Sequence, residues 1–180
     1  MKILKTELEG LLVIQPKVFY DDRGYFYEAF RADLLADLGL RVEFVQDNFS
    51  KSKKNTVRGL HYQVGKNAQG KLCQVISGKV LDVALDIRYN SPTYGKYYSH
   101  ELSDENHTMI WIPPGFAHGF SVLSDEAVFM YRCTAYYSKE DERSILYNDD
   151  DLNINWEVDV PIVSDKDLQA KQFKDIDKDF

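Results

Sequence analysis

Residues 80–88 read VLDVALDIR, and this stretch decides the fold class. Every second residue from Leu81 to Ile87 is apolar, whereas the positions between them include Asp82 and Asp86. A repeat of two residues is the period of a β-strand, because successive side chains point to opposite faces. The stretch is therefore predicted to be a strand with one apolar face and one face that is wet or polar.

Similar short runs rich in Val, Ile, Phe and Tyr lie on both sides of this stretch, with turn residues between them. That pattern is typical of an all-β sandwich or barrel. Two short helices are expected to interrupt the strands, one around residues 33–38 with Gly39 just past its end, and one that begins at Ser164. The other candidate strands are residues 11–16, 25–30, 44–50, 57–63, 71–78, 97–102, 109–113, 118–123 and 128–137.

The length of 180 residues, without repeats or Pro/Gly/Ser linkers, predicts one domain over residues 1–180, with a short helical tail from about residue 164 to residue 180. A net charge of −7 argues against nucleic acid as a partner. The first 16 residues contain only a four-residue apolar run, so neither a signal peptide nor a membrane span is expected. Cys73 and Cys133 lie far apart and match no metal or redox spacing, which fits a reducing cytoplasm and two core thiols.

Four histidines are candidates for chemistry. His100 and His107 flank the polar turn SDEN and are expected on the surface. His61 lies inside the apolar strand RGLHYQ, where a histidine either is hydrogen-bonded in the core or faces a cavity. Position alone leaves both interpretations open.

His118 lies in WIPPGFAHGF, residues 111–120, where two prolines and Gly115 predict a tight turn before a strand. The segment resembles the second motif of the cupin barrels, PxGxxH, whose histidine is often a metal ligand. The first cupin motif supplies HxH and a nearby Glu, but residues 61–75 contain one histidine and no carboxylate. A site of three or four ligands cannot be assembled from these residues. We therefore expect no metal and no other cofactor, with His118 lining or bracing a pocket.

A more specific resemblance covers nearly the whole chain. Several segments together resemble the dTDP-4-dehydrorhamnose 3,5-epimerases, and the long block at residues 44–63 is the most diagnostic. The resemblance implies an all-β, cupin-type jelly-roll barrel with a few short peripheral helices, and a homodimer. It also implies that dTDP-4-dehydro-6-deoxy-D-glucose is epimerised at C3 and C5, beside its ketone, in dTDP-L-rhamnose biosynthesis for lipopolysaccharide and other polysaccharides. The segments are DDRGYFYEAF, FVQDNFSKSKKNTVRGLHYQ, AQGKL, WIPPGFAHGF, YRCTAYYS and SDKD.

The resemblance also assigns catalytic roles. His61 is the base that removes a proton beside the ketone, and Tyr131 is the acid that returns one to the other face of the sugar ring. Lys71 would stabilise the oxyanion, and Asp167 would pair with His61. Without the resemblance, other interpretations are preferred: Ser164 and Asp167 form a helix capping box, Tyr131 is a core residue, and Lys71 is a surface residue at a strand edge.

The resemblance assigns further residues to substrate binding. Arg23 and Phe26 would reach the other subunit's ligand, where Arg suits a diphosphate and Phe suits stacking on thymine. Arg58 is implied as a pocket cation, but strict alternation would place it on the face opposite His61 unless the strand bends at Gly59. The remaining substrate-binding candidates are Glu28, Gln46, Asn48, His118, Tyr137, Glu142 and Lys166.

Three other functions are compatible with the sequence. A related enzyme could epimerise only one carbon, or act on another deoxysugar nucleotide, with the same base and acid. A metal-dependent cupin enzyme and a barrel that binds sugar without catalysis are the alternatives from other classes.

Overall fold

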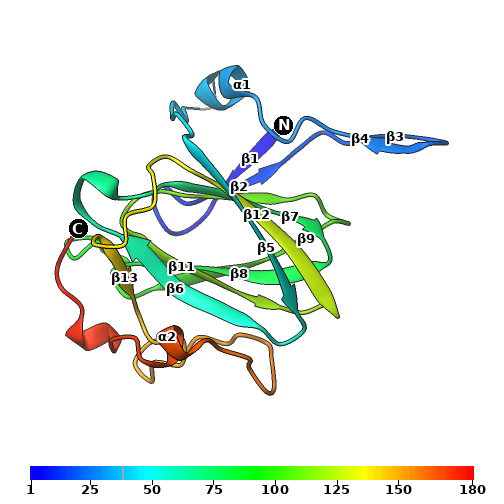
Figure 1. The fold of residues 1–180 in the computed structure, drawn as a ribbon. Coiled ribbons are helices and arrows are strands. Elements are labelled where there is room, and N and C mark those ends of the chain that lie inside the picture. Colours follow the sequence, from blue (N-terminus) through cyan, green and yellow to red (C-terminus); the bar gives the residue numbers. More distant parts are fainter. Residues whose placement is uncertain (38) are drawn as a thin grey trace.

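The computed structural model describes residues 1–37 and 39–180, and strands dominate it. Two antiparallel sheets face each other, and a separate hairpin stands apart from them (Figure 1). The first sheet has the order β1-β2-β10-β7-β12-β5, the second has the order β13-β6-β11-β8-β9, and the hairpin pairs β3 with β4. The strands are β1 Lys2–Lys5, β2 Leu12–Gln15, β3 Phe19–Asp21, β4 Gly24–Phe26, β5 Gln46–Lys53, β6 Val57–Gln63, β7 Lys71–Ser77, β8 Lys79–Asp86, β9 Tyr97–Ser103, β10 Met109–Ile112, β11 Phe116–Val122, β12 Glu126–Cys133 and β13 Glu142–Ser144.

The all-β prediction is confirmed, and most predicted strands coincide with observed ones within a few residues. The predicted strand at 25–30 is wrong beyond Phe26, where β4 ends and the chain turns back toward the body of the protein. The predicted strand at 128–137 ends at Cys133, because a loop begins there. The short strands β1, β3 and β13 were not predicted, since three or four residues carry little periodic signal.

The face of β8 that carries Asp82 and Asp86 is polar, as predicted, but it is not wet, because both faces of this strand are buried. Val80 and Ala84 face the core between the two sheets, whereas Leu81, Val83 and Leu85 pack under the C-terminal part of the chain. A buried carboxylate needs partners. Asp86 accepts hydrogen bonds from Arg88, Ser91 and Thr93, and Asp82 pairs with His118.

The helices are all short, as expected: α1 Ala32–Asp37, α2 Asp165–Leu168, and the 3-10 turns η1 Gly65–Asn67 and η2 Phe173–Asp175. Amide hydrogen bonds from Gly39 to Ala36 and from Leu40 to Leu35 close α1, and Gly39 has the positive φ of 89° that such an end requires. Leu38, the last residue of the predicted helix, lies outside the described residues. Helix α2 follows Ser164 as predicted, with the Ser164 hydroxyl accepting from the Asp167 amide.

The hairpin β3–β4 projects away from the two sheets (Figure 1), and residues 19–26 are all exposed. We call residues 19–26 the arm. At the opposite side of the molecule, α2 and the C-terminal segment lie beneath β6 (Figure 1). Among the described residues, no helix is long and apolar enough to cross a membrane.

The prediction that His107 lies on the surface is wrong, since only 5% of it is exposed. Its ring contacts two tyrosine rings at the base of the arm, which cover it. His100 is half-buried on β9. Both cysteines are buried free thiols, as predicted.

Candidate active site

His61 and Asp167 form a close pair, although they lie 106 residues apart in sequence. His61 Nε2 lies 2.6 Å from Asp167 Oδ1, and the other carboxylate oxygen accepts the Gly59 amide at 3.3 Å. Burial by itself would raise the pKa of Asp167, but the hydrogen bonds and the charge of His61 hold it below its usual value. Asp167 is therefore an ionised partner for the imidazole.

The capping interpretation of SDKD is half right. The Ser164 hydroxyl caps the Asp167 amide at 3.2 Å, but the Asp167 carboxylate does not serve only local donors, because it reaches β6. Helix α2 thus fixes the backbone of Asp167, and β6 receives its side chain. His61 faces the cavity and is not enclosed in the core, since about a third of its side chain is exposed.

Tyr131 and Lys71 lie on the opposite wall, on strands β12 and β7 of the first sheet. Both line pocket surfaces together with His61. Burial, and then the nearby thiols, raise the pKa of Tyr131 to about 12, so the phenol keeps its proton at neutral pH. Two sheets thus bring an imidazole and a phenol to face one cavity.

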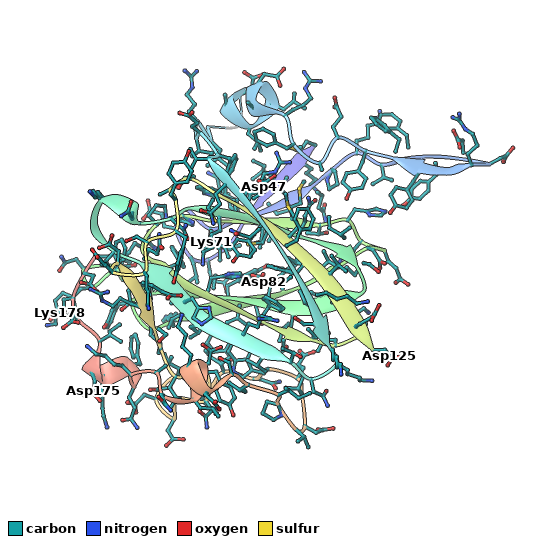
Figure 2. All side chains as sticks on the ribbon, in the orientation of Figure 1. Asp47, Lys71, Asp82, Asp125, Asp175 and Lys178 are labelled. Carbon is teal, nitrogen blue, oxygen red and sulfur yellow. The ribbon has the colours of Figure 1, made fainter. Side chains whose placement is uncertain are left out.

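The Lys71 side chain is buried, and Figure 2 shows it, like Asp82, in the interior between the two sheets. Its Nζ donates to the His61 carbonyl oxygen at 3.4 Å and lies 5.8 Å from the centre of the Tyr131 ring. Burial lowers the pKa of Lys71, and the nearby carboxylates of Asp82 and Glu142 oppose that effect. The alternative interpretation, a surface lysine at a strand edge, is wrong, because only 8% of Lys71 is exposed and β7 lies between β10 and β12.

Arg58 lines the same cavity as His61, which strict alternation would not allow. On the neighbouring strand β11, His118 pairs with His61 and Phe120 pairs with Arg58. The pairing therefore advances by three residues along β6 but by only two along β11. The irregularity is at Gly59, whose φ is 128°. The predicted bend is therefore present, and Arg58 Nε donates to Ser52 Oγ at 3.0 Å.

His118 and Asp82 form a second, deeper pair, with 2.8 Å between Nε2 and Oδ2. Burial lowers the pKa of His118 despite the carboxylate, so the imidazole is neutral at pH 7. His118 lines the cavity, as expected. The pairing of His118 with Asp82 was not predicted. The available signal was the aspartate in the middle of an apolar strand, because a buried carboxylate needs a partner.

The residues around His118 do not reproduce the ligand set of a metal cupin. Donor atoms of Cys73, Asp82 and His118 lie within 4.8 Å of one another. Only the histidine corresponds to the cupin set of HxH, Glu and His, and the Asp82 carboxylate is already bonded to it.

Five predicted binding residues form a hydrogen-bonded rim beside the cavity. Gln46 donates to Asn48 at 3.0 Å and accepts the Tyr137 amide at 2.9 Å. The Tyr137 hydroxyl donates to Glu142 at 3.0 Å, and Lys166 forms an ion pair with Glu142 at 2.6 Å. Burial would raise the pKa of Glu142, but these two donors hold it below its usual value.

Gln63 was not predicted, although it orders the loop that carries Tyr137. Its side chain accepts the Ser138 amide at 2.7 Å and donates to the carbonyl oxygens of Asn67 and Tyr136. A buried amide with all of these bonds rigidifies the loop. Its place as the last residue of RGLHYQ was the available signal.

Arg23, Phe26 and Glu28 do not join the cavity of their own chain. Arg23 and Phe26 lie in the exposed arm, and Glu28 follows it. The Arg23 side chain is 89% exposed and pairs with Asp21, while Glu28 pairs with Arg31. These three are the predicted site residues that the fold separates from His61.

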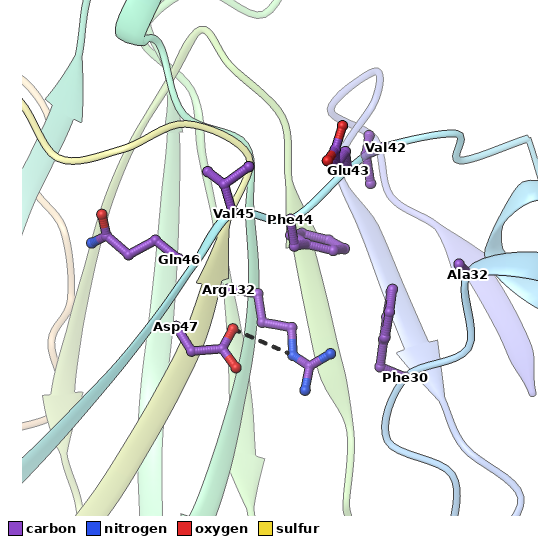
Figure 3. A pocket seen from close by; sticks show the side chains of 9 residues that line it. All are labelled: Phe30, Ala32, Val42, Glu43, Phe44, Val45, Gln46, Asp47 and Arg132. Atoms are coloured by element: carbon purple, nitrogen blue, oxygen red, sulfur yellow. Dashed lines mark ion pairs between the residues drawn. The ribbon is translucent and has the colours of Figure 1, made fainter.

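A second hollow lies on the outer face of the first sheet, between the α1 segment and β5 (Figure 3). Arg132 forms an ion pair with Asp47 at 3.6 Å and stacks over Phe30. Of the predicted site residues, only Gln46 contributes to it. Because Tyr131 and Arg132 are neighbours on β12, they point to opposite faces, and this hollow is separate from the His61 cavity.

Comparison with known proteins identifies the family. The family model described as dTDP-4-dehydrorhamnose 3,5-epimerase matches residues 5–175. The Shigella flexneri enzyme of that name is 52% identical over 178 residues, 98% of each chain. The crystal structure of the Elizabethkingia anophelis enzyme superposes with a TM-score of 0.94 at 50% identity, covering 100% of this chain and 99% of that one.

A third relative is the dTDP-6-deoxy-D-glucose-3,5-epimerase from Legionella pneumophila, solved in complex with dTDP-4-keto-L-rhamnose. It is 49% identical with a TM-score of 0.94, covering 98% of this chain and 94% of that one. These likenesses confirm the cupin-type jelly-roll fold with short peripheral helices. The chain belongs to the dTDP-4-dehydrorhamnose 3,5-epimerase family of isomerases.

Proposed function

We propose that the protein converts dTDP-4-dehydro-6-deoxy-D-glucose to dTDP-4-dehydro-L-rhamnose by inverting C3 and C5. The observation that carries this proposal is the placement of His61, with its buried carboxylate partner, across one cavity from Tyr131. Epimerisation beside a ketone needs a base on one face of the ring and an acid on the other. The sugar nucleotide held by the Legionella relative supports the choice of substrate.

His61 would begin each inversion by taking the proton from the carbon beside the ketone. The electron pair of that C–H bond moves into an enolate, and its oxygen becomes negative. Asp167 stabilises the imidazolium and fixes the tautomer, because its carboxylate lies 2.6 Å from Nε2. The ammonium of Lys71 would stabilise the enolate oxygen.

Tyr131 would complete the inversion by donating its proton to the opposite face of the same carbon. The pKa of about 12 keeps this phenol protonated at neutral pH, ready to act as an acid. The cycle closes when solvent takes the proton from His61 and returns one to Tyr131. The same pair serves both carbons, which flank one carbonyl group.

The nucleotide end of the substrate would lie along the rim formed by Gln46, Asn48, Tyr137, Glu142 and Lys166, beside the Arg58 guanidinium. We further infer a homodimer in which the exposed Arg23 and Phe26 of each arm reach the other subunit's nucleotide, with Glu28 beside them. A cytoplasmic enzyme of dTDP-L-rhamnose synthesis is consistent with its two free thiols.

Proton NMR of the substrate in deuterated water tests the proposal. We expect the wild-type protein to introduce deuterium at both C3 and C5. His61→Asn should abolish exchange, and Tyr131→Phe should block inversion at one carbon or both. Tyr89→Phe is the matched control, since this half-exposed tyrosine lies outside the cavity.

Other outcomes lead to other functions. Exchange at a single carbon would assign the protein to the single-site epimerases. Exchange by wild-type protein that His61→Asn leaves unchanged would contradict the role of His61. No exchange, with dTDP still bound, would indicate another deoxysugar nucleotide or a binding protein.

A further inference from the structure

The arm touches the body of the protein through a small aromatic cluster at its base. The Tyr25 ring lies 4.5 Å from the His107 ring, and the Tyr27 ring lies 4.9 Å from it, between ring centres. Tyr25 and Tyr27 also stack on each other at 6.1 Å. His107 therefore contacts both tyrosines, one inside the arm and one just past its end.

His107 is held firmly on its own side of this contact. It lies in the turn between β9 and β10 with a φ of 52°, and its amide donates to the Ser103 carbonyl at 3.0 Å. The preceding Asn106 accepts the amides of Ser103 and Thr108 and donates to the Glu101 carbonyl. The turn is thus fixed by side-chain hydrogen bonds, and only 5% of His107 is exposed.

Among the described residues, few other contacts fix the orientation of the arm relative to the body. Its residues are exposed, and Tyr20 packs edge-on against Tyr25 within the hairpin at 6.1 Å. A two-stranded hairpin is marginally stable by itself in water. A rigid ring at its base would fix the angle at which it leaves the body.

We propose that His107 is a positioning residue for nucleotide binding: its ring, packed against Tyr25 and Tyr27, fixes the direction in which the arm carries Arg23 and Phe26 into the other subunit's site. This inference rests on the proposed homodimer with arms that act in trans. His107 touches neither the substrate nor the reacting groups, so it acts through the arm. Loss of the ring would leave the chemistry intact and weaken the hold on the nucleotide.

Steady-state kinetics of a small set of variants tests this role. We expect His107→Ala to raise the KM for the sugar nucleotide about tenfold, because two aromatic contacts are lost, with kcat within about twofold of wild type. His107→Phe should restore KM, since it keeps a planar ring between the tyrosines. Tyr89→Ala removes an aromatic contact far from the arm and should leave KM unchanged.

A double-mutant cycle separates positioning from stability. In a protein that already carries Arg23→Ala and Phe26→Ala, the addition of His107→Ala should raise KM no further, because the arm then has no side chains to position. A full additional increase in that background would overturn the proposal. So would an unchanged KM for His107→Ala with only a lowered melting temperature.

Calorimetric titration with dTDP distinguishes this inference from the proposed reaction. If wild-type protein binds dTDP and His107→Ala weakens binding about tenfold, the arm role stands even where no epimerisation is seen. If His107→Ala binds dTDP as tightly as wild type, the arm role fails even where the wild-type enzyme inverts both carbons.

Discussion

His61 and Asp167 are unequally placed: the histidine side chain is 31% exposed, whereas the aspartate is 4% exposed. The histidine can therefore meet a substrate, while the carboxylate meets only the protein. An ionised group that is nearly out of water acts strongly on its neighbour, because the local dielectric constant is low. The effect of removing its charge can be measured directly.

Asp167→Asn is expected to lower kcat by about 10²- to 10⁴-fold, since an amide does not stabilise the imidazolium and can favour the wrong tautomer. Initial rates of deuterium exchange at C3 and C5 check this. Ser164→Ala is the control for the position of α2: loss of the cap should cost about 1 kcal/mol of stability and leave kcat within about twofold. If the control lost as much activity, the helix position, and not the carboxylate, would limit the rate.

Asp86 makes the stability of the folded protein depend on pH. It is fully buried, and burial opposes its charge, but hydrogen bonds from Arg88, Ser91 and Thr93 lower its pKa to about 2. A pKa below the unfolded value stabilises the folded state above about pH 4, and this contribution disappears as pH falls from 4 towards 2. Asp86→Asn should therefore lower the free energy of unfolding, measured with urea, by about 2 kcal/mol at pH 7 and by distinctly less at pH 3. An equal loss at both pH values would contradict this.

The course of strand β6 decides whether the candidate site exists, because Arg58 and His61 share one cavity only through the irregularity at Gly59. A Cβ at this glycine would lie 2.5 Å from Gly119 Cα and 2.9 Å from the His118 carbonyl oxygen. Gly59→Ala is expected to lower the free energy of unfolding by roughly 3 kcal/mol or more, as measured by chemical denaturation. Gly24→Ala is a matched control, with a φ of 132° but nothing within 4 Å of the added carbon. Equal losses would assign the cost to backbone strain alone.

The elements also show what the sequence could predict. Strands such as β6 and β8 were predicted because their apolar residues recur with a clear period. The burial of Asp82 is not predictable from the period, because the period cannot show that the first sheet covers this face of β8 or that His118 pairs with the carboxylate. The burial of His107 was missed because the tyrosines that cover it come from about 80 residues earlier in the chain. Pairing across such separations depends on the fold and leaves no local pattern.

The proposed site is divided between the body of the protein and its arm. The body of one chain holds His61, Tyr131 and the rim, whereas Arg23 and Phe26 are exposed at a distance from them. If the arm acts in trans, two defective proteins can repair each other. His61→Asn keeps its arm but loses its base, and the double variant Arg23→Ala, Phe26→Ala keeps its base but loses the arm.

Each mixed dimer would then contain one complete site, made of the body of the arm variant and the arm of the His61 variant. After equal amounts are unfolded and refolded together, half of the dimers are mixed, so about a quarter of wild-type activity should return at low substrate concentration. Each variant refolded alone is the control and should stay far below that level. If the arm served its own chain, no mixed dimer would hold a complete site, and the mixture would be no more active than the average of its two components.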